Sequence, residues 1–172
     1  SKNQIVEMQY DNLNRLINKV TKNSTGETDK NVNYYYDTFQ GSPCRIANAY
    51  TNTSNGSLCA TNDDATTTRF WFDELGREVN NQKILDDQTY EIKKEYDNLD
   101  RLTKVIQPIN SNTGQRDEIY YTYYDIGAIK TITGQENGQD KTYVAGIDYN
   151  AQGQKTKIEY CNGVITNYEY NT

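Results

Sequence analysis

The chain has 172 residues, a formal net charge of −6 and no histidine. The negative charge argues against nucleic-acid binding, which needs clustered cations, and the lack of histidine removes the commonest general base and metal ligand. Hydrophobic residues make up 34% with the 16 tyrosines included, so we expect a thin core. Because disordered chains are poor in aromatic residues, we expect a folded protein in which tyrosine supplies much of the buried surface.

A short phrase recurs along the chain. Tyr10-Asp-Asn-Leu-Asn-Arg-Leu16 returns as Tyr96-Asp-Asn-Leu-Asp-Arg-Leu102, with six of the seven residues identical. Less regular copies begin at Tyr36, Phe72, Tyr124 and Tyr149, and a last partial copy begins at Tyr170. Such repetition indicates one supersecondary unit that buries its apolar face by stacking on its neighbours. The expected function is therefore that of an array rather than of one pocket.

Each copy, numbered from its aromatic residue, has the composition of a β-hairpin turn. Position 2 is Asp or Asn, and position 5 in the four best copies is Asn14, Gly76, Asp100 or Gly153. A type I turn favours Asp or Asn first, and a following left-handed residue suits a hairpin. Gly, Asn and Asp tolerate positive φ best. We therefore predict positive φ at these four residues.

Two copies depart from this pattern. The copy at Tyr124 is interpreted as one residue short, because Gly127 arrives early. The copy at Tyr36 carries Gln40 and Gly41, so its turn is expected to differ.

The longest interval between copies is rich in Ser, Thr and Asn and is interpreted as an exposed inserted loop at about residues 41–68. Cys44 and Cys59 lie in this interval. A disulfide between them would close a loop of 16 residues and stabilise the fold by roughly 3 kcal/mol. Two cysteines that bracket one loop can equally be free thiols, so both alternatives stay open, and Cys161 is expected to be unpaired.

The segments between the turns have the pattern of strands. Val32–Tyr36, Ile119–Tyr124 and Val164–Tyr170 alternate with a period of two and are rich in Tyr, Thr, Val and Ile. Asn162-Gly163 is a two-residue hairpin signal. At most one short turn of helix is expected, between Asn80 and Tyr90. The expected fold class is all-β, an array of antiparallel β-hairpins that forms a curved, twisted sheet.

The phrase resembles the hallmark of the YD-repeat, or Rhs, family, which is Tyr-Asp-x-x-Gly-Arg-Leu. Phe72-Asp-Glu-Leu-Gly-Arg77, the two Asn-Leu-x-Arg copies and the stretch Ile147–Tyr170 carry the resemblance. It covers nearly the whole chain and is weakest from Pro43 to Thr68. The family implies a hairpin array that spirals into a hollow shell. In bacterial polymorphic toxins the shell encloses a C-terminal toxin domain, and a related shell in teneurins serves cell adhesion.

We therefore expect residues 1–172 to be a single YD-repeat fragment of a larger protein. Within this fragment, Ile5–Tyr10 is expected to be the first strand. The family's self-cleavage motif contains Asp-Pro, and neither Pro43 nor Pro108 follows Asp. No catalytic, cofactor-binding or metal-binding residue is assigned, and the protein is not expected to be an enzyme. The expected role is structural, in a secreted or surface-displayed bacterial protein. The expected partners are the remainder of the parent shell and its enclosed toxin domain.

Some polar and aromatic residues invite other interpretations. The pairs Asp63-Asp64 and Asp86-Asp87 are expected to be solvated loop residues, and the arginines of the phrase to stack on aromatic rings or to pair with acids. The alternative function is a carbohydrate- or cell-surface-binding module that uses exposed aromatic residues. Its candidates are Phe70 to Phe72 around Trp71, Tyr34 to Tyr36, and Tyr120 to Tyr124. No apolar run is long enough for membrane insertion, and unpaired sheet edges predict edge-mediated dimers of an isolated fragment.

Overall fold

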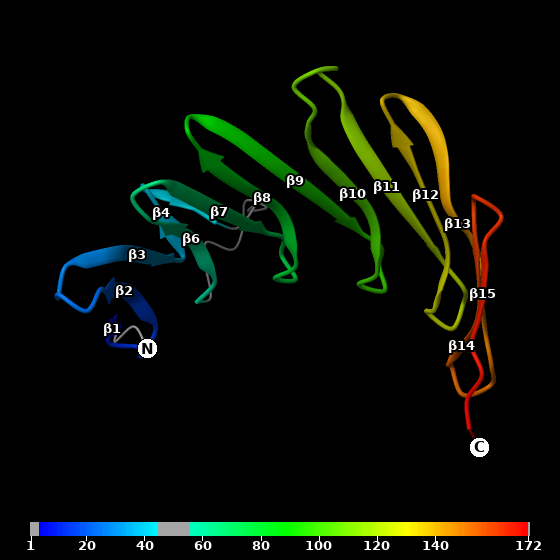
Figure 1. Cartoon of the computed structure of the whole chain (residues 1–172), viewed down its shortest axis with the longest axis horizontal. Coiled ribbons are helices and arrows are strands. Elements are labelled where there is room, and N and C mark those ends of the chain that lie inside the picture. Colours follow the sequence, from blue (N-terminus) through cyan, green and yellow to red (C-terminus); the bar gives the residue numbers. More distant parts are fainter. Residues whose placement is uncertain (1–3, 45–55, 172) are drawn as a thin grey trace. The chain divides into compact units, whose positions relative to one another are not determined.

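The computed structural model describes residues 4–44 and 56–171, and its regular elements are all β-strands (Figure 1). The strands are β1 (Ile5–Tyr10), β2 (Leu16–Lys22), β3 (Thr28–Tyr36), β4 (Thr38–Phe39), β5 (Ser42–Pro43), β6 (Leu58–Asn62), β7 (Thr66–Phe72), β8 (Glu78–Leu85), β9 (Gln88–Tyr96), β10 (Leu102–Ile109), β11 (Arg116–Tyr123), β12 (Ile129–Glu136), β13 (Gln139–Tyr149), β14 (Lys155–Tyr160) and β15 (Ile165–Asn167). The helical turn expected between Asn80 and Tyr90 is wrong, because β8 and β9 occupy that segment. Nowhere in the two described ranges is there a helix long and apolar enough to cross a membrane.

The strands pair antiparallel in chain order. Hydrogen-bonded neighbours follow the order β1-β2-β3-β6-β7-β8-β9-β10-β11-β12-β13-β14-β15, and β4 and β5 form a separate two-stranded hairpin. Apart from β5 and β6, successive strands in Figure 1 are joined by short turns. The expected all-β array of antiparallel hairpins is thereby confirmed.

Contacts divide the chain into two compact units, Ser1–Glu91 and Ile92–Thr172. The first contains β1 to β8 and the start of β9, and the second contains the rest. The interval 41–68, expected to be an inserted loop, is partly strand in the structure, because β6 and the start of β7 lie within it. Residues 45–55 of that interval lie outside the described residues.

Each unit has a small core. In the first unit Phe39, Cys44, Cys59 and Ala60 are buried, with Phe72 packed against them. In the second unit the buried residues are Val144, Ile147 and Ile158. No polar or charged residue is buried in the part of the chain that the structure describes, and most strand residues are half-buried. The thin core expected from the composition is confirmed.

The regular copies of the phrase share one turn. The amide of Asp11 donates to the carbonyl of Arg15 at 3.0 Å, and the amide of Asn14 donates to the carbonyl of Asp11 at 3.0 Å. Copies at Asp73, Asp97 and Asn150 repeat both bonds. The φ angle is positive at all four predicted residues, which are Asn14 (60°), Gly76 (81°), Asp100 (61°) and Gly153 (77°). This prediction is confirmed.

The fifth regular copy begins one residue earlier than expected. The amide of Tyr124 donates to the carbonyl of Ala128 at 2.8 Å, and the amide of Gly127 donates to the carbonyl of Tyr124 at 2.9 Å. Gly127 has a φ of 87°. Tyr123 is therefore position 1, Tyr124 stands at position 2 in place of Asp, and the interpretation of a shortened copy is wrong.

The sequence indicates two other turns that differ from the common form. In the Tyr36 copy, Gln40 (φ 49°) and Gly41 (φ 76°) form the two-residue turn of the β4–β5 hairpin, so the expected difference is confirmed. The hairpin expected at Asn162-Gly163 is present, but only Gly163 has positive φ. The amide of Tyr160 donates to the carbonyl of Val164 at 2.9 Å, and the amide of Gly163 donates to the carbonyl of Tyr160 at 3.0 Å. These are the two bonds of the common turn, so three residues rather than two separate the bonded ends.

Candidate functional site: the repeated clamp

The carboxylate at position 2 organises each regular turn. Oδ1 of Asp11 accepts hydrogen bonds from the amides of Leu13 and Arg15, each at 2.9 Å, and Oδ2 accepts from Nε of Arg15 at 2.7 Å. The Asp73–Arg77 and Asp97–Arg101 pairs repeat the ion pair at 2.6 and 2.7 Å. One carboxylate thus satisfies two turn amides and orients the arginine of its own copy.

The oriented arginine reaches the next copy. Cζ of Arg15 lies 4.6 Å from the centre of the Tyr36 ring, and Nη1 of Arg15 donates to Oδ2 of Asp37 at 2.9 Å. In the second unit, Cζ of Arg101 lies 4.7 Å from the centre of the Tyr123 ring. A guanidinium over an aromatic face is attracted by the ring quadrupole. The expectation that these arginines stack on rings or pair with acids is confirmed.

The stacked tyrosine binds back to the preceding copy. The hydroxyl of Tyr36 donates to the carbonyl of Leu16, position 7 of the preceding phrase, at 3.1 Å. The same bond joins Tyr123 to Leu102 (2.6 Å), Tyr149 to Ile129 (3.0 Å) and Tyr170 to Lys155 (2.9 Å). We call the carboxylate at position 2, the arginine at position 6 and the tyrosine that begins the next copy the clamp. The hydroxyl explains why tyrosine rather than phenylalanine dominates position 1.

Two copies replace parts of the clamp with other side chains. In the copy that begins at Tyr123, position 6 is Ala128, and the ring of Tyr124 instead packs edge-on against Tyr149, with ring centres 6.3 Å apart. In the next copy, the amide Nδ2 of Asn150 donates to Oε1 of Gln154 at 2.8 Å. An amide pair here takes the place of the ion pair between positions 2 and 6.

The clamp carboxylates are held in the ionised form. The Arg101 backbone amide and guanidinium donate hydrogen bonds that lower the pKa of Asp97, and those of Arg15 lower the pKa of Asp11 in the same way. Burial raises the pKa of the phenols of Tyr123 and Tyr149. The groups are therefore fixed in the protonation states in which they hydrogen-bond within the sheet.

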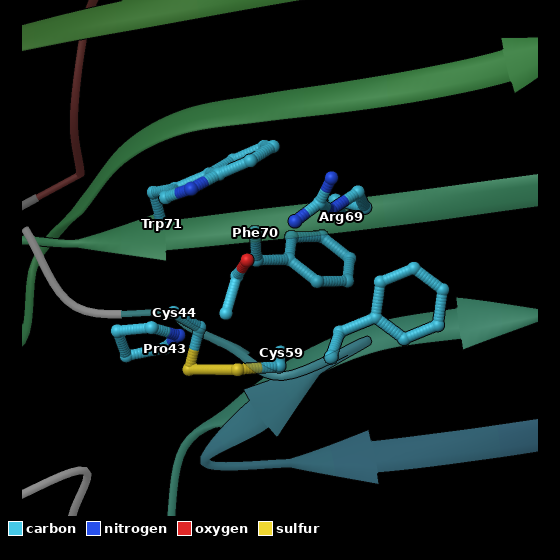
Figure 2. Close-up of a pocket in the computed structure, with 8 residues that line it drawn as sticks. Pro43, Cys44, Cys59, Arg69, Phe70 and Trp71 are labelled. Atoms are coloured by element: carbon cyan, nitrogen blue, oxygen red, sulfur yellow. A yellow bond between two sulfur atoms is a disulfide. The ribbon is translucent and has the colours of Figure 1, made fainter.

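A hollow in the first unit is a second candidate site (Figure 2). Its lining residues are Phe39, Ser42, Pro43, Cys44, Cys59, Arg69, Phe70 and Trp71. Figure 2 shows Arg69, Phe70 and Trp71 projecting from β7, and the Cys44–Cys59 disulfide beside Pro43. The hollow is too narrow to hold a water molecule, so it is a packing defect rather than a ligand site.

Of the two alternatives for the cysteines, the structure contains the disulfide. The Cα atoms of Cys44 and Cys59 are 5.1 Å apart, and the two residues are only 3% and 1% exposed. The carbonyl of Cys44 also accepts a hydrogen bond from the amide of Phe72 at 2.9 Å, so the disulfide ties the β4–β5 hairpin into the sheet. Cys161 is free and exposed, as expected.

The aromatic groups considered for carbohydrate binding contact other side chains of the sheet. Tyr35 packs edge-on against Phe39, with ring centres 4.8 Å apart. Cζ of Arg69 lies 4.9 Å from the ring centre of Trp71. The hydroxyl of Tyr120 donates to the carboxylate of Glu118. These contacts favour the structural interpretation of the aromatic residues.

The acidic pairs are placed in turns. Oδ1 of Asp63 accepts from the amide of Thr66 at 2.7 Å, and its Oδ2 pairs with Lys30 at 3.0 Å. Asp86 and Asp87 form the turn between β8 and β9 with φ of 48° and 60°. Within residues 4–44 and 56–171, no three acidic or cysteine side chains gather as a metal site requires.

The contacts between successive copies were not predicted from the sequence. Residues 11–15 predict the turn, but Tyr36 and Asp37, which Arg15 also contacts, lie more than twenty residues away at the end of β3. The signal that points to them is the coincidence of Arg at position 6 with Tyr at the start of the next copy.

The fold and the clamp define the chain as an antiparallel hairpin array whose copies are joined through tyrosine-led turns. The same fold occurs in the crystal structure of TcdB2-TccC3 without its hypervariable C-terminal region, with a TM-score of 0.71 and 17% identity. A structure of the Photorhabdus luminescens Tc holotoxin pore, with the mutation TccC3-D651A, matches with a TM-score of 0.70 and 18% identity. TcdB2-TccC3-Cdc42 matches with a TM-score of 0.70 and 16% identity. The resemblance to YD-repeat shells expected from the sequence is confirmed at the level of the fold.

Each match covers 98% of this chain but only 8% of the other chain. The first structure lacks the hypervariable C-terminal region, so the matched segment lies outside that region. No family model matches the chain, and no curated protein matches it.

Proposed function

We propose that the chain is a structural segment of a YD-repeat shell that encloses a toxin or effector domain, with no catalytic activity of its own. The observation that carries this proposal is the match of 98% of the chain to a part of TcdB2-TccC3 outside the hypervariable C-terminal region. The partners are the remainder of the parent shell and the enclosed domain. The parent is a secreted or surface-displayed bacterial protein in which residues 1–172 form one repeat region with an inserted segment at about residues 41–68.

The clamp supports a role in building a wall. It links the copies that begin at Tyr10 and Tyr96 to the copies that follow them, through the contacts of Arg15 with Tyr36 and of Arg101 with Tyr123. A wall about one sheet thick has little buried volume, so it needs lateral links of this kind between hairpins. The buried Cys44–Cys59 disulfide supports folding in an oxidising compartment, as secretion or surface display would require.

A chimaera tests this proposal. The segment of TcdB2-TccC3 that aligns with this chain is replaced by the chain, and the protease sensitivity of the hypervariable C-terminal region is followed over time. We expect this region to stay protected as in the parent protein. Cleavage as fast as in a control with a Gly/Ser linker of equal length would refute the role.

A matched control carries Arg15→Ala and Arg101→Ala in the grafted chain. These changes remove the cations that bridge successive copies and leave the turns in place. If the clamp holds the copies together as a wall, the protection of the C-terminal region from protease should be intermediate between that in the intact graft and that in the linker control.

A further inference from the structure

The first tyrosine of the array differs from its equivalents. Tyr36, Tyr123 and Tyr149 are half-buried and donate their hydroxyls to carbonyls of the preceding copy. Tyr10 is 51% exposed, and its hydroxyl contacts Sδ of Met8 on its own strand at 3.3 Å. A thioether is a weak acceptor. Tyr10 therefore has the sequence of a clamp residue without a clamp partner in the described part of the chain.

The strand that carries Tyr10 is an edge. Among the described residues β1 pairs only with β2. All six of its residues are exposed, and its large side chains Ile5, Val6, Met8 and Tyr10 are each about half exposed. An open edge of this kind is a template for another strand.

Strand pairing in the other copies indicates which strand could pair with the open edge of β1. Strand β3, which leads into Tyr36, pairs with β2, which follows the preceding phrase. In the same way β11 pairs with β10, and β13 pairs with β12. In these three pairs the strand that ends at position 1 lies beside the strand that begins at position 7 of the preceding phrase. The exception is β7, which ends at Phe72 and pairs with β6 after the irregular Tyr36 copy.

We propose that β1 is a docking edge for a β-hairpin that carries the same phrase. The carbonyl at position 7 of the incoming hairpin accepts the Tyr10 hydroxyl, and the arginine at position 6 stacks on the Tyr10 ring and pairs with Asp11. The inference goes beyond the proposed function, because it holds for any array of this kind whatever the array encloses.

The same geometry disfavours a dimer in which two molecules of this chain pair through their β1 strands. Two β1 strands in an antiparallel pair each end at a position-1 tyrosine, so neither strand offers the other a position-7 carbonyl or a position-6 arginine. Such a pair leaves both Tyr10 hydroxyls on their weak acceptors. Selectivity for a phrase-bearing hairpin therefore resides in Tyr10 and Asp11 rather than in the backbone edge.

The test extends the full chain with a duplicate of its own residues 5–30, joined directly before Ile5. This length places the original Tyr10 26 residues after the duplicated one, the same step that separates Tyr10 from Tyr36. We expect slower amide hydrogen exchange in the original β1. Tyr10→Phe at the original position should reduce that protection roughly five-fold, as expected for one lost hydrogen bond, and should leave the unextended chain unchanged.

A matched control places Arg15→Ala in the duplicated segment only. It should lower the protection of the original β1 amides from hydrogen exchange, while the original Arg15–Tyr36 contact stays intact. Equal exchange of β1 in the extended and unextended chains would overturn the proposal. An equal effect of Tyr10→Phe in both chains would overturn it as well.

A second probe does not depend on the extension folding. A synthetic peptide of residues 92–109, which contains the Tyr96 phrase between two strand segments, is titrated into the unextended chain and followed by NMR. Shifts confined to β1 and β2 that vanish with a scrambled-phrase peptide support the docking edge. Equal binding of both peptides, or dimerisation of the chain through β1 in place of peptide binding, contradicts the proposed selectivity.

Discussion

The guanidinium carbon of Arg15 lies 4.6 Å from the centre of the Tyr36 ring. The arginine closes one turn and the tyrosine opens the next, so a contact between them joins two hairpins that are otherwise linked by backbone hydrogen bonds. The Tyr36 hydroxyl reinforces the link by donating to the carbonyl of Leu16. The effect of a substitution on stability is therefore expected to depend on the position of the residue within the repeat as well as on how deeply its side chain is buried.

The tyrosine hydroxyls should differ in their contribution to stability. Tyr36→Phe removes the hydrogen bond to Leu16 and is expected to lower the free energy of unfolding by about 1 kcal/mol. Tyr10→Phe removes only a contact to a thioether and should change it by less than about 0.5 kcal/mol. Urea denaturation measures both. Equal losses would show that the clamp hydroxyl has no special role.

Acid should weaken the turns. Hydrogen bonds from the arginine of the same copy lower the pKa of Asp11 and Asp97 in the folded chain, whereas the pKa of an unfolded aspartate is about 3.9. The unfolded chain therefore takes up protons first as the pH falls. The stabilisation is complete well above about pH 4 and is lost as the pH falls through the folded-state pKa values.

Asp97→Asn isolates one such turn. The amide keeps an acceptor for the turn but has no charge to lose. The variant should therefore be less stable than the parent at pH 7, and the gap should narrow as the pH falls below about 4. Urea midpoints at pH 7 and pH 3 measure the gap, and a gap that widens in acid would contradict the assignment.

Two strand glycines should respond differently to alanine. A Cβ at Gly134 on β12 would lie 2.9 Å from Cε2 of Tyr143 and would collide with the carbonyl oxygen of Glu118. Gly134→Ala is therefore expected to cost about 1–3 kcal/mol. A Cβ at Gly146 on β13 would have Oε2 of Glu159 as its nearest neighbour, at 3.9 Å, so Gly146→Ala should stay within about 0.5 kcal/mol. Thermal unfolding of the two variants measures the contrast. A larger loss of stability for Gly146→Ala than for Gly134→Ala would contradict the close approach of the β11 backbone to Gly134.

The disulfide should matter for the first unit. Replacing Cys44 and Cys59 together by serine removes a closed loop of 16 residues and is expected to lower the free energy of unfolding by roughly 3 kcal/mol. Trp71 is the sole tryptophan and lines the hollow beside the disulfide, so its fluorescence reports the loss. Cys161→Ser is the control, since this thiol is exposed and free. A matching loss in the control would exclude a specific effect of the bridge.

One position of the phrase shows where sequence reasoning reaches its limit. Position 4 holds Leu75 in a regular copy, where the side chain is 70% exposed at the tip of the turn. It holds Phe39 in the Tyr36 copy, where the side chain is 8% exposed and packs against Tyr35. The phrase makes the two positions equivalent. The difference arises because the Gln40-Gly41 turn folds the β4–β5 hairpin back onto the sheet.

The turns were determined by the sequence alone, since a five-residue bend depends on hydrogen bonds and φ preferences within itself. Asn14 and Gly153 therefore follow from local chemistry, and so does the order of the hairpins. Only the tertiary structure decided that Tyr124 replaces an aspartate, that Cys44 bonds to Cys59, and that Arg15 and Arg101 contact the tyrosines of the following copies. Those pairs depend on strand register and on bulges at the ends of the ladders, which are set by packing between segments distant in the chain.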